Sequence, residues 1–194
     1  MCEMRHWNRR INLTAITNPE DIAIKHFLDA IAPIAAIPEE ARIVDIGSGA
    51  GFPGLPIKVV RSLSHLTLVD SSRKKTNFLR HVIRQLKLDQ VHTVQVRIED
   101  FVCDPPVGEH FDIIVSRAFT DVTALTRMVM PLLKKGGKLM MWKGPHIEKE
   151  IRALNALQEI LPDALVVKIH QYRLPIINVG RNLISVNLQG SVTN

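Results

Sequence analysis

Short runs rich in Val, Ile and Leu alternate with segments of helical periodicity from about residue 42 onward. Runs that are apolar at nearly every position are typical of parallel strands buried on both faces. The segments between them are typical of crossover helices, and the clearest of these is the amphipathic segment Ser72–Leu86. The predicted parallel strands are Arg42–Ile46, His65–Asp70, Val91–Val96, Phe111–Val115 and Lys138–Trp142. This pattern predicts an α/β fold with a doubly wound sheet.

The last two apolar runs, Ala164–Ile169 and Leu183–Leu188, follow a different pattern. No helix-period segment separates them, and the loop between them contains Pro175 and Gly180. Such spacing is typical of antiparallel strands, because parallel strands need a long crossover. We therefore predict seven strands in all, five parallel and two in a C-terminal antiparallel hairpin.

A helical part is predicted ahead of the sheet. Asn18 followed by Pro19 is typical of a helix start, with Asn18 as the cap and Pro19 in the first turn. The apolar positions that we expect this helix to turn inward are Ile24, Phe27, Leu28, Ile31 and Ile34. We expect one domain over residues 1–194, with an N-terminal helical part at 1–37 and the sheet at 38–194.

Composition limits the class of protein. A chain of 194 residues with 46% hydrophobic and 23% charged residues can bury one sizeable core. The longest apolar stretch, near residues 30–37, contains Pro33 and is too short for a bilayer span. The first residues lack a secretory signal pattern, so we expect a cytoplasmic protein without membrane association. The two cysteines lie far apart and outside CxxC spacing, so we expect neither a disulfide framework nor a metal site.

The charge balance favours a polyanionic partner. Lys and Arg number 25 against 19 Asp and Glu, which gives a net charge of +6. A basic surface attracts nucleic acids over long range and gains from counterion release. This signal alone is weak, because many basic proteins bind no nucleic acid.

A glycine-rich loop follows the first predicted strand. Residues 49–54 fit GxGxxG, the dinucleotide fingerprint, while residues 45–51 fit the D/ExGxGxG loop of S-adenosylmethionine-dependent methyltransferases. Asp45 favours the second interpretation, because a carboxylate suits the cationic amino-acid part of S-adenosylmethionine and would repel a pyrophosphate. Asp70, at the end of the next strand, is placed to accept hydrogen bonds from ribose hydroxyls in either case.

Several separated blocks resemble one known family. They are Trp7-Asn8, Asn12–Thr14, Lys25–Asp29, Val44–Gly54 and Ser116–Phe119. Together they resemble the RsmG (GidB) family of bacterial 16S ribosomal RNA guanine-N7 methyltransferases. The resemblance implies a Rossmann-like methyltransferase sheet that uses S-adenosylmethionine, releases S-adenosylhomocysteine and needs no metal. It implies as acceptor N7 of the guanosine at position 527 of 16S ribosomal RNA. Family members usually begin with a further helical segment, of which this chain carries a part.

The resemblance and the loop pattern together give the expected cofactor site. Its residues are Asp45, Gly47, Gly49, Gly51, Phe52, Asp70, Ile98, Glu99 and Arg117. Arg117 follows a central strand, where a cation faces the ligand crevice of an open sheet. His26 and Asp29 lie three residues apart on the early helix, where they would face each other. We predict that Arg117, His26 and Asp29 take part in catalysis.

The expected partner is 16S ribosomal RNA or a precursor of the small subunit, bound by a monomer. The residues predicted to contact RNA are Arg9, Arg10, Lys143 and Phe119. Two other classes of function stay open from the sequence. An NAD-linked oxidoreductase would use the same glycine loop, and a non-catalytic RNA-binding module would keep the same fold.

Overall fold

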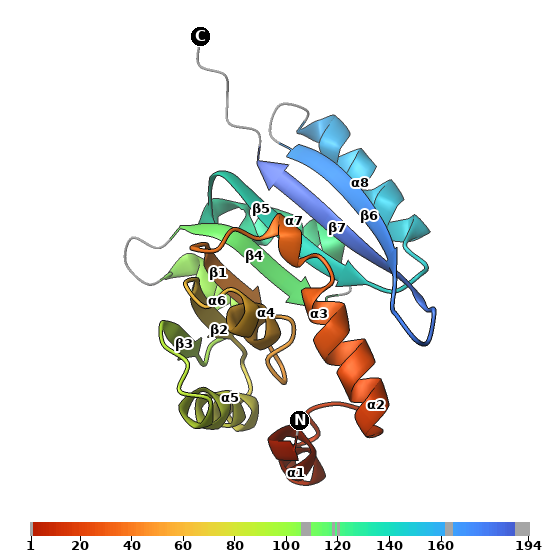
Figure 1. Cartoon of the computed structure of the whole chain (residues 1–194). Helices are drawn as coiled ribbons and strands as arrows, with labels where there is room; N and C mark the ends of the chain where they lie inside the picture. The colour runs from red at the N-terminus through yellow and green to blue at the C-terminus, as the bar shows by residue number, and fades with distance from the viewer. Residues whose placement is uncertain (1, 106–109, 118, 120, 162–164, 189–194) are drawn as a thin grey trace.

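A seven-stranded sheet lies at the centre of the structure, which is a computed structural model describing residues 2–105, 110–117, 119, 121–161 and 165–188 (Figure 1). The strand order is β3-β2-β1-β4-β5-β7-β6. The strands are β1 Arg42–Ile46, β2 His65–Val69, β3 Val91–Val94, β4 Phe111–Arg117, β5 Leu133–Lys143, β6 Leu165–Arg173 and β7 Gly180–Leu188. Strands β1 to β5 pair in parallel and β7 pairs antiparallel with both β5 and β6, as predicted.

Helices cover both faces of this sheet, which confirms the doubly wound α/β prediction. They are α4 Gly54–Val60, α5 Arg73–Gln85, α6 Ile98–Cys103, α7 Val122–Val129 and α8 Glu148–Ile160. Alternate strand residues separate into two buried clusters, because successive side chains of a strand point to opposite faces. Ile43 packs with Leu55 of α4 and Phe78 of α5, whereas Val44 packs with Leu125 of α7 and Leu154 of α8.

Some strand boundaries differ from the prediction. Strand β5 begins at Leu133, five residues before the predicted start, although Gly136 within it has a φ of +78°. The pairing register with β4 shifts between Phe111 and Ile113, which absorbs these residues as an irregularity. β3 ends earlier than predicted, β6 and β7 are both longer, and the predicted strand start at Ala164 lies outside the described residues.

The N-terminal part consists of α1 Cys2–Ile11, α2 Pro19–Ile22, the π-helical turn η1 Ala23–Leu28, α3 Asp29–Ile31 and the short turn η2 Ile34–Ala36. Asn18 caps α2 as predicted, because its side-chain oxygen accepts hydrogen bonds from the N–H groups of Glu20 and Asp21. The π-helical turn was not predicted. A wider turn changes the direction in which residues at its end and beyond it point. Asp29 is buried, while Leu28, the last residue of the turn and expected inside, is 36% exposed.

The N-terminal helices lie beside the sheet near the carboxyl end of β4, where Figure 1 shows α3 next to the arrowhead of that strand. The bond from the Arg117 guanidinium to the carbonyl of Lys25 joins the two regions.

Among the described residues, no helix combines the length and the apolar character needed to cross a membrane.

Candidate functional site

A cavity of about 600 Å³ opens at the carboxyl ends of β1, β2 and β4. The strand order reverses beside β1, and ligands of open α/β sheets bind in the crevice at such a point. Six predicted site residues line this cavity: Gly47, Asp70, Ile98, Glu99, Arg117 and Phe119. Its size and position are those of a cofactor site.

The glycine loop after β1 forms one wall of the cavity. Gly47 has a φ of +70°, and a Cβ added to it would meet no protein atom within 4 Å. The residue therefore combines a backbone conformation that side chains rarely adopt with open space beside it. Such a cradle lets a ligand approach the main chain closely.

Asp70 is held firmly at the same wall. Its Oδ2 accepts a hydrogen bond from the Gly49 N–H at 2.9 Å and its Oδ1 accepts one from the Ser72 N–H at 2.8 Å. A carboxylate oxygen has two lone pairs, so each oxygen can still accept a ligand hydroxyl. Asp70 is thus fixed in place with acceptor capacity to spare, and Gly49 contributes by fixing it. Ribose recognition by Asp70 stays a prediction.

Four residues of the predicted cofactor set, Asp45, Gly49, Gly51 and Phe52, are not part of the cavity lining. A Cβ on Gly51, at a φ of +87°, would lie 2.4 Å from Leu55 Cδ1, so this glycine permits close packing. Phe52 stacks on His26 with ring centroids 4.9 Å apart. These contacts give Gly51 and Phe52 a structural role in the loop and leave their contact with a cofactor a prediction.

Asp45 lies fully buried beneath the loop. Its Oδ2 accepts a hydrogen bond from the Gly54 N–H at 2.9 Å, and its Oδ1 has no partner among the described residues. Burial raises the pKa of this carboxyl to about 7. The sign of its charge was the reason for preferring a cofactor with a cationic group, but the structure gives the side chain a different place, below the loop.

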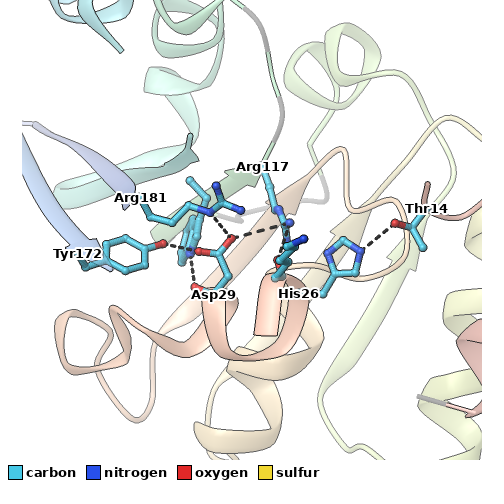
Figure 2. Close-up of polar contacts among 8 residues, drawn as sticks. Thr14, His26, Asp29, Arg117, Tyr172 and Arg181 are labelled. Carbon is cyan, nitrogen blue, oxygen red and sulfur yellow. Dashed lines mark hydrogen bonds and ion pairs between the residues drawn. The ribbon is translucent and has the colours of Figure 1, made fainter. Parts of the chain in front are cut away.

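His26 and Asp29 point in different directions, which corrects the expectation that they face each other (Figure 2). His26 Nε2 lies 2.8 Å from Thr14 Oγ1, and the ring packs on Phe52. Burial and the nearby Arg117 charge lower the pKa of His26 to about 4. The imidazole is therefore neutral at pH 7.

Asp29 lies at the centre of a polar cluster and is 2% exposed. Tyr172 donates its hydroxyl hydrogen to Oδ1 at 2.7 Å, and Arg181 Nε lies 3.5 Å from Oδ2. The carbonyl of Asp29 accepts a hydrogen bond from Trp142 Nε1 at 2.9 Å. The cluster therefore ties the N-terminal helix to β5 through Trp142 and to the C-terminal hairpin through Tyr172 and Arg181. Figure 2 shows the contacts of Asp29 with Tyr172 and Arg181.

Arg117 connects this cluster to the cavity. Its Nη2 donates to the carbonyl of Lys25 at 2.8 Å and lies 3.8 Å from Asp29 Oδ2. Burial lowers the pKa of the guanidinium and the Asp29 charge opposes that change, but an arginine keeps its charge in proteins. Its Nη1 is buried without a hydrogen-bond partner among the described residues. A buried donor without an acceptor is costly, so an acidic ligand group fits here.

The residues predicted to contact RNA lie in two places: Lys143 and Phe119 are in contact, and Arg9 and Arg10 lie on α1. Lys143 donates a hydrogen bond from Nζ to the carbonyl of Phe119 and lies 3.9 Å from Glu150 Oε1, so it is already engaged. Arg9 and Arg10 lie exposed on the last turn of α1. Their contact with RNA stays a prediction.

Tyr172 and Arg181 were missed by the sequence interpretation. Tyr172 is the single tyrosine of the chain, and nothing in its neighbourhood indicated a site. Its partner Asp29 is 143 residues away, and only the folded chain brings them together. The position of Arg181 at the start of β7 gave no signal either.

The cavity fits the cofactor that the sequence predicts. Asp70 offers acceptors for ribose hydroxyls, and Val96 and Ile98 offer an apolar wall for a base. Within the part of the chain that the structure describes, no group of His, Cys, Asp or Glu side chains is arranged to hold a metal ion.

Known proteins resemble this chain over most of its length. A family model described as rRNA small subunit methyltransferase G, GidB, matches residues 1–187. A ribosomal RNA small subunit methyltransferase G of Desulforamulus reducens is 40% identical over 182 residues, covering 93% of this chain and 75% of that protein. Its counterpart in Desulfitobacterium hafniense is 45% identical over 145 residues, covering 75% of this chain and 60% of that protein.

A solved structure confirms the fold. The crystal structure of an rRNA methylase from Streptococcus thermophilus matches with a TM-score of 0.60 at 16% identity, covering 91% of this chain and all of that one. At this level of identity the likeness concerns the Rossmann-like methyltransferase fold alone. The family model, in contrast, matches nearly the whole sequence, and with the identity to the two relatives it shows that the chain belongs to the GidB family, rRNA small subunit methyltransferase G.

Proposed function

We propose that this protein transfers a methyl group from S-adenosylmethionine to N7 of a guanosine in small-subunit ribosomal RNA, in the cytoplasm. The observation that carries the proposal is the cavity at the switch point of the sheet, with Asp70, Gly47 and Arg117 in its lining. Arg117 Nη1 is buried and has no partner among the described residues. Family membership and the excess of basic residues support an RNA substrate.

The cofactor, when bound, supplies a methyl group on a positively charged sulfur. Asp70 would hold the ribose hydroxyls, since both its oxygens are fixed by backbone N–H groups. Arg117 would hold the carboxylate, because its Nη1 has no other acceptor among the described residues. Val96 and Ile98 would pack against the adenine. These residues bind and orient; they do no bond-making themselves.

The acceptor atom explains why the site needs no general base. Guanine N7 is an acceptor with a free lone pair and carries no proton, so no proton has to be removed as the new bond forms. His26 agrees with this view, because its ring is engaged with Thr14 and Phe52. The contribution of the protein is to hold the two reactants in line and to exclude water.

The test is transfer of a labelled methyl group from S-adenosylmethionine to unmethylated small-subunit ribosomal RNA, followed by digestion and identification of the nucleoside. We expect 7-methylguanosine at a single position. Arg117→Gln should abolish transfer and weaken S-adenosylhomocysteine binding, whereas Lys168→Gln, an exposed change of equal charge, should do neither. Label on another atom, or no label despite cofactor binding, would contradict the proposal.

A further inference from the structure

A second, smaller cavity lies beside the cofactor cavity. It has a volume of about 230 Å³ and is lined by Asp29, Arg117, Trp142, Lys143, Gly144 and Arg181. Arg117 lines both cavities. A group bound in the second cavity therefore lies one side chain away from the cofactor.

The charges around this second cavity do not balance. Lys143 is matched by two carboxylates, Glu150 and Asp121, whereas the guanidiniums of Arg117 and Arg181 share the one carboxylate of Asp29. A single carboxylate does not neutralise two guanidiniums. An excess of this kind in a concave, partly buried place favours an anion.

The hydrogen-bond donors around the cavity are also in excess. Asp29 Oδ1 is taken by the Tyr172 hydroxyl, and Oδ2 is shared between the two guanidiniums. Within the described chain Arg117 Nη1 has no partner and is the donor proposed above for the cofactor carboxylate, whereas the terminal nitrogens of Arg181 make no hydrogen bond and stay available for another ligand. The Arg181 side chain is 18% exposed, so a ligand can reach it.

We infer that this second cavity binds a phosphate group of the RNA backbone, held chiefly by Arg181, next to the guanosine whose base enters the cofactor cavity. Guanidinium groups suit phosphate because their planar N–H donors match its oxygens. The inference rests on the proposed function. A carboxylate of the cofactor has similar chemistry, so the experiment separates the two sources.

The experiment compares Arg181→Gln, Arg181→Lys and the control Lys168→Gln, which removes an equal charge from an exposed position of the same hairpin. Binding of unmethylated small-subunit ribosomal RNA is measured over a series of salt concentrations. We expect Arg181→Gln to reduce the slope of log K against log salt by about 0.7 to 1 relative to the control, the effect of one lost phosphate contact. Arg181→Lys keeps the charge and should keep the slope.

Two further measurements make the result decisive. S-adenosylhomocysteine binding should be equal in wild type and Arg181→Gln, and thermal unfolding shows that each variant is folded. An unchanged slope in a folded Arg181→Gln protein overturns the inference, and loss of S-adenosylhomocysteine binding with an unchanged slope assigns the site to the cofactor. These measurements report binding and do not depend on methyl transfer. If the wild-type protein binds RNA but transfers no methyl group, the proposed function is refuted and the inference about the second cavity is not.

Discussion

Gly47 and Gly51 belong to the same loop but have different surroundings: Gly47 borders the open cavity and Gly51 packs against a buried side chain. Both have positive φ, so alanine would introduce left-handed strain of about 1–2 kcal/mol at either position. A Cβ at Gly47 would enter the open cofactor cavity, whereas a Cβ at Gly51 would collide with the buried side chain of Leu55. Alanine at Gly47 should therefore act mainly on cofactor binding, and alanine at Gly51 mainly on the free energy of unfolding.

We predict that Gly47→Ala weakens S-adenosylhomocysteine binding at least tenfold and lowers the free energy of unfolding by no more than the backbone strain. Gly51→Ala should lower the free energy of unfolding by a further 1–3 kcal/mol or so, since overpacking a core has that effect. Calorimetric titration and urea unfolding of both variants check this pair. Equal loss of affinity in the two variants would contradict the division of roles.

The buried groups His26 and Asp45 predict opposite pH dependences. The pKa of His26 falls from 6.5 to about 4 on folding, so between these values the unfolded chain binds more protons and stability rises with pH. The pKa of Asp45 rises from 3.8 to about 7, so over that range the folded chain binds more protons and stability falls with pH. From about pH 4 to 6.5 the two effects oppose each other.

We predict that Asp45→Asn removes the opposing effect of Asp45, so that the free energy of unfolding rises with pH as His26 dictates. Relative to wild type, its free energy of unfolding should gain roughly 1.4 kcal/mol for each pH unit within that range. His26→Gln should change the slope in the opposite direction. Urea denaturation at several pH values between 4.5 and 6.5 measures these slopes, and parallel curves for wild type and Asp45→Asn would disprove the assignment for Asp45.

At the scale of the elements, the sequence predicted what depends on local pattern. The apolar runs located all seven strands, and the rule that ligands bind at carboxyl ends of parallel strands located Asp70 and Arg117. The start of β5 was not predicted, because residues 134–137 are lysine or glycine and resemble a loop. The contacts of Tyr172 and Arg181 with Asp29 were not predicted, because contacts between distant parts of the chain leave no periodic signal in the sequence.

The cap of the N-terminal helix α2 can be tested directly by its effect on stability. Asn18 accepts hydrogen bonds from the backbone N–H groups of Glu20 and Asp21 at 2.9 and 3.1 Å. We predict that Asn18→Ala lowers the free energy of unfolding by about 1 kcal/mol, the usual effect of losing a helix cap. Asn18→Asp, which can still accept these bonds, should restore most of it. Urea denaturation measures both, and equal losses in the two variants would refute the capping role.

At the scale of the whole molecule, the basic charge is spread over more than one region. Helix α1 is anchored through Trp7, whose ring centroid lies 5.6 Å from that of Phe78 on α5. This anchor leaves Arg9 and Arg10 exposed at the end of α1. The two arginines thus form a fixed pair of charges outside both cavities.

We predict that the double variant Arg9→Gln, Arg10→Gln reduces the salt dependence of RNA binding by about 1.4, two contacts at 0.7 each for single-stranded RNA. Cofactor binding should not change, because α1 does not line the cofactor cavity. The double variant Lys149→Gln, Arg152→Gln, which removes two exposed charges from α8, is the matched control. A double variant with the slope of that control would remove α1 from the RNA-binding surface.

The position of β7 between β5 and β6 has a consequence for the order of folding. During synthesis β6 leaves the ribosome before β7, yet β7 is the strand that joins it to the rest of the sheet. Tyr172 on β6 therefore reaches Asp29 only after the last strand has inserted. We expect a nascent chain halted before residue 180 to lack this contact, so the enzyme matures in a single late step, and pulse proteolysis of stalled chains would reveal that step.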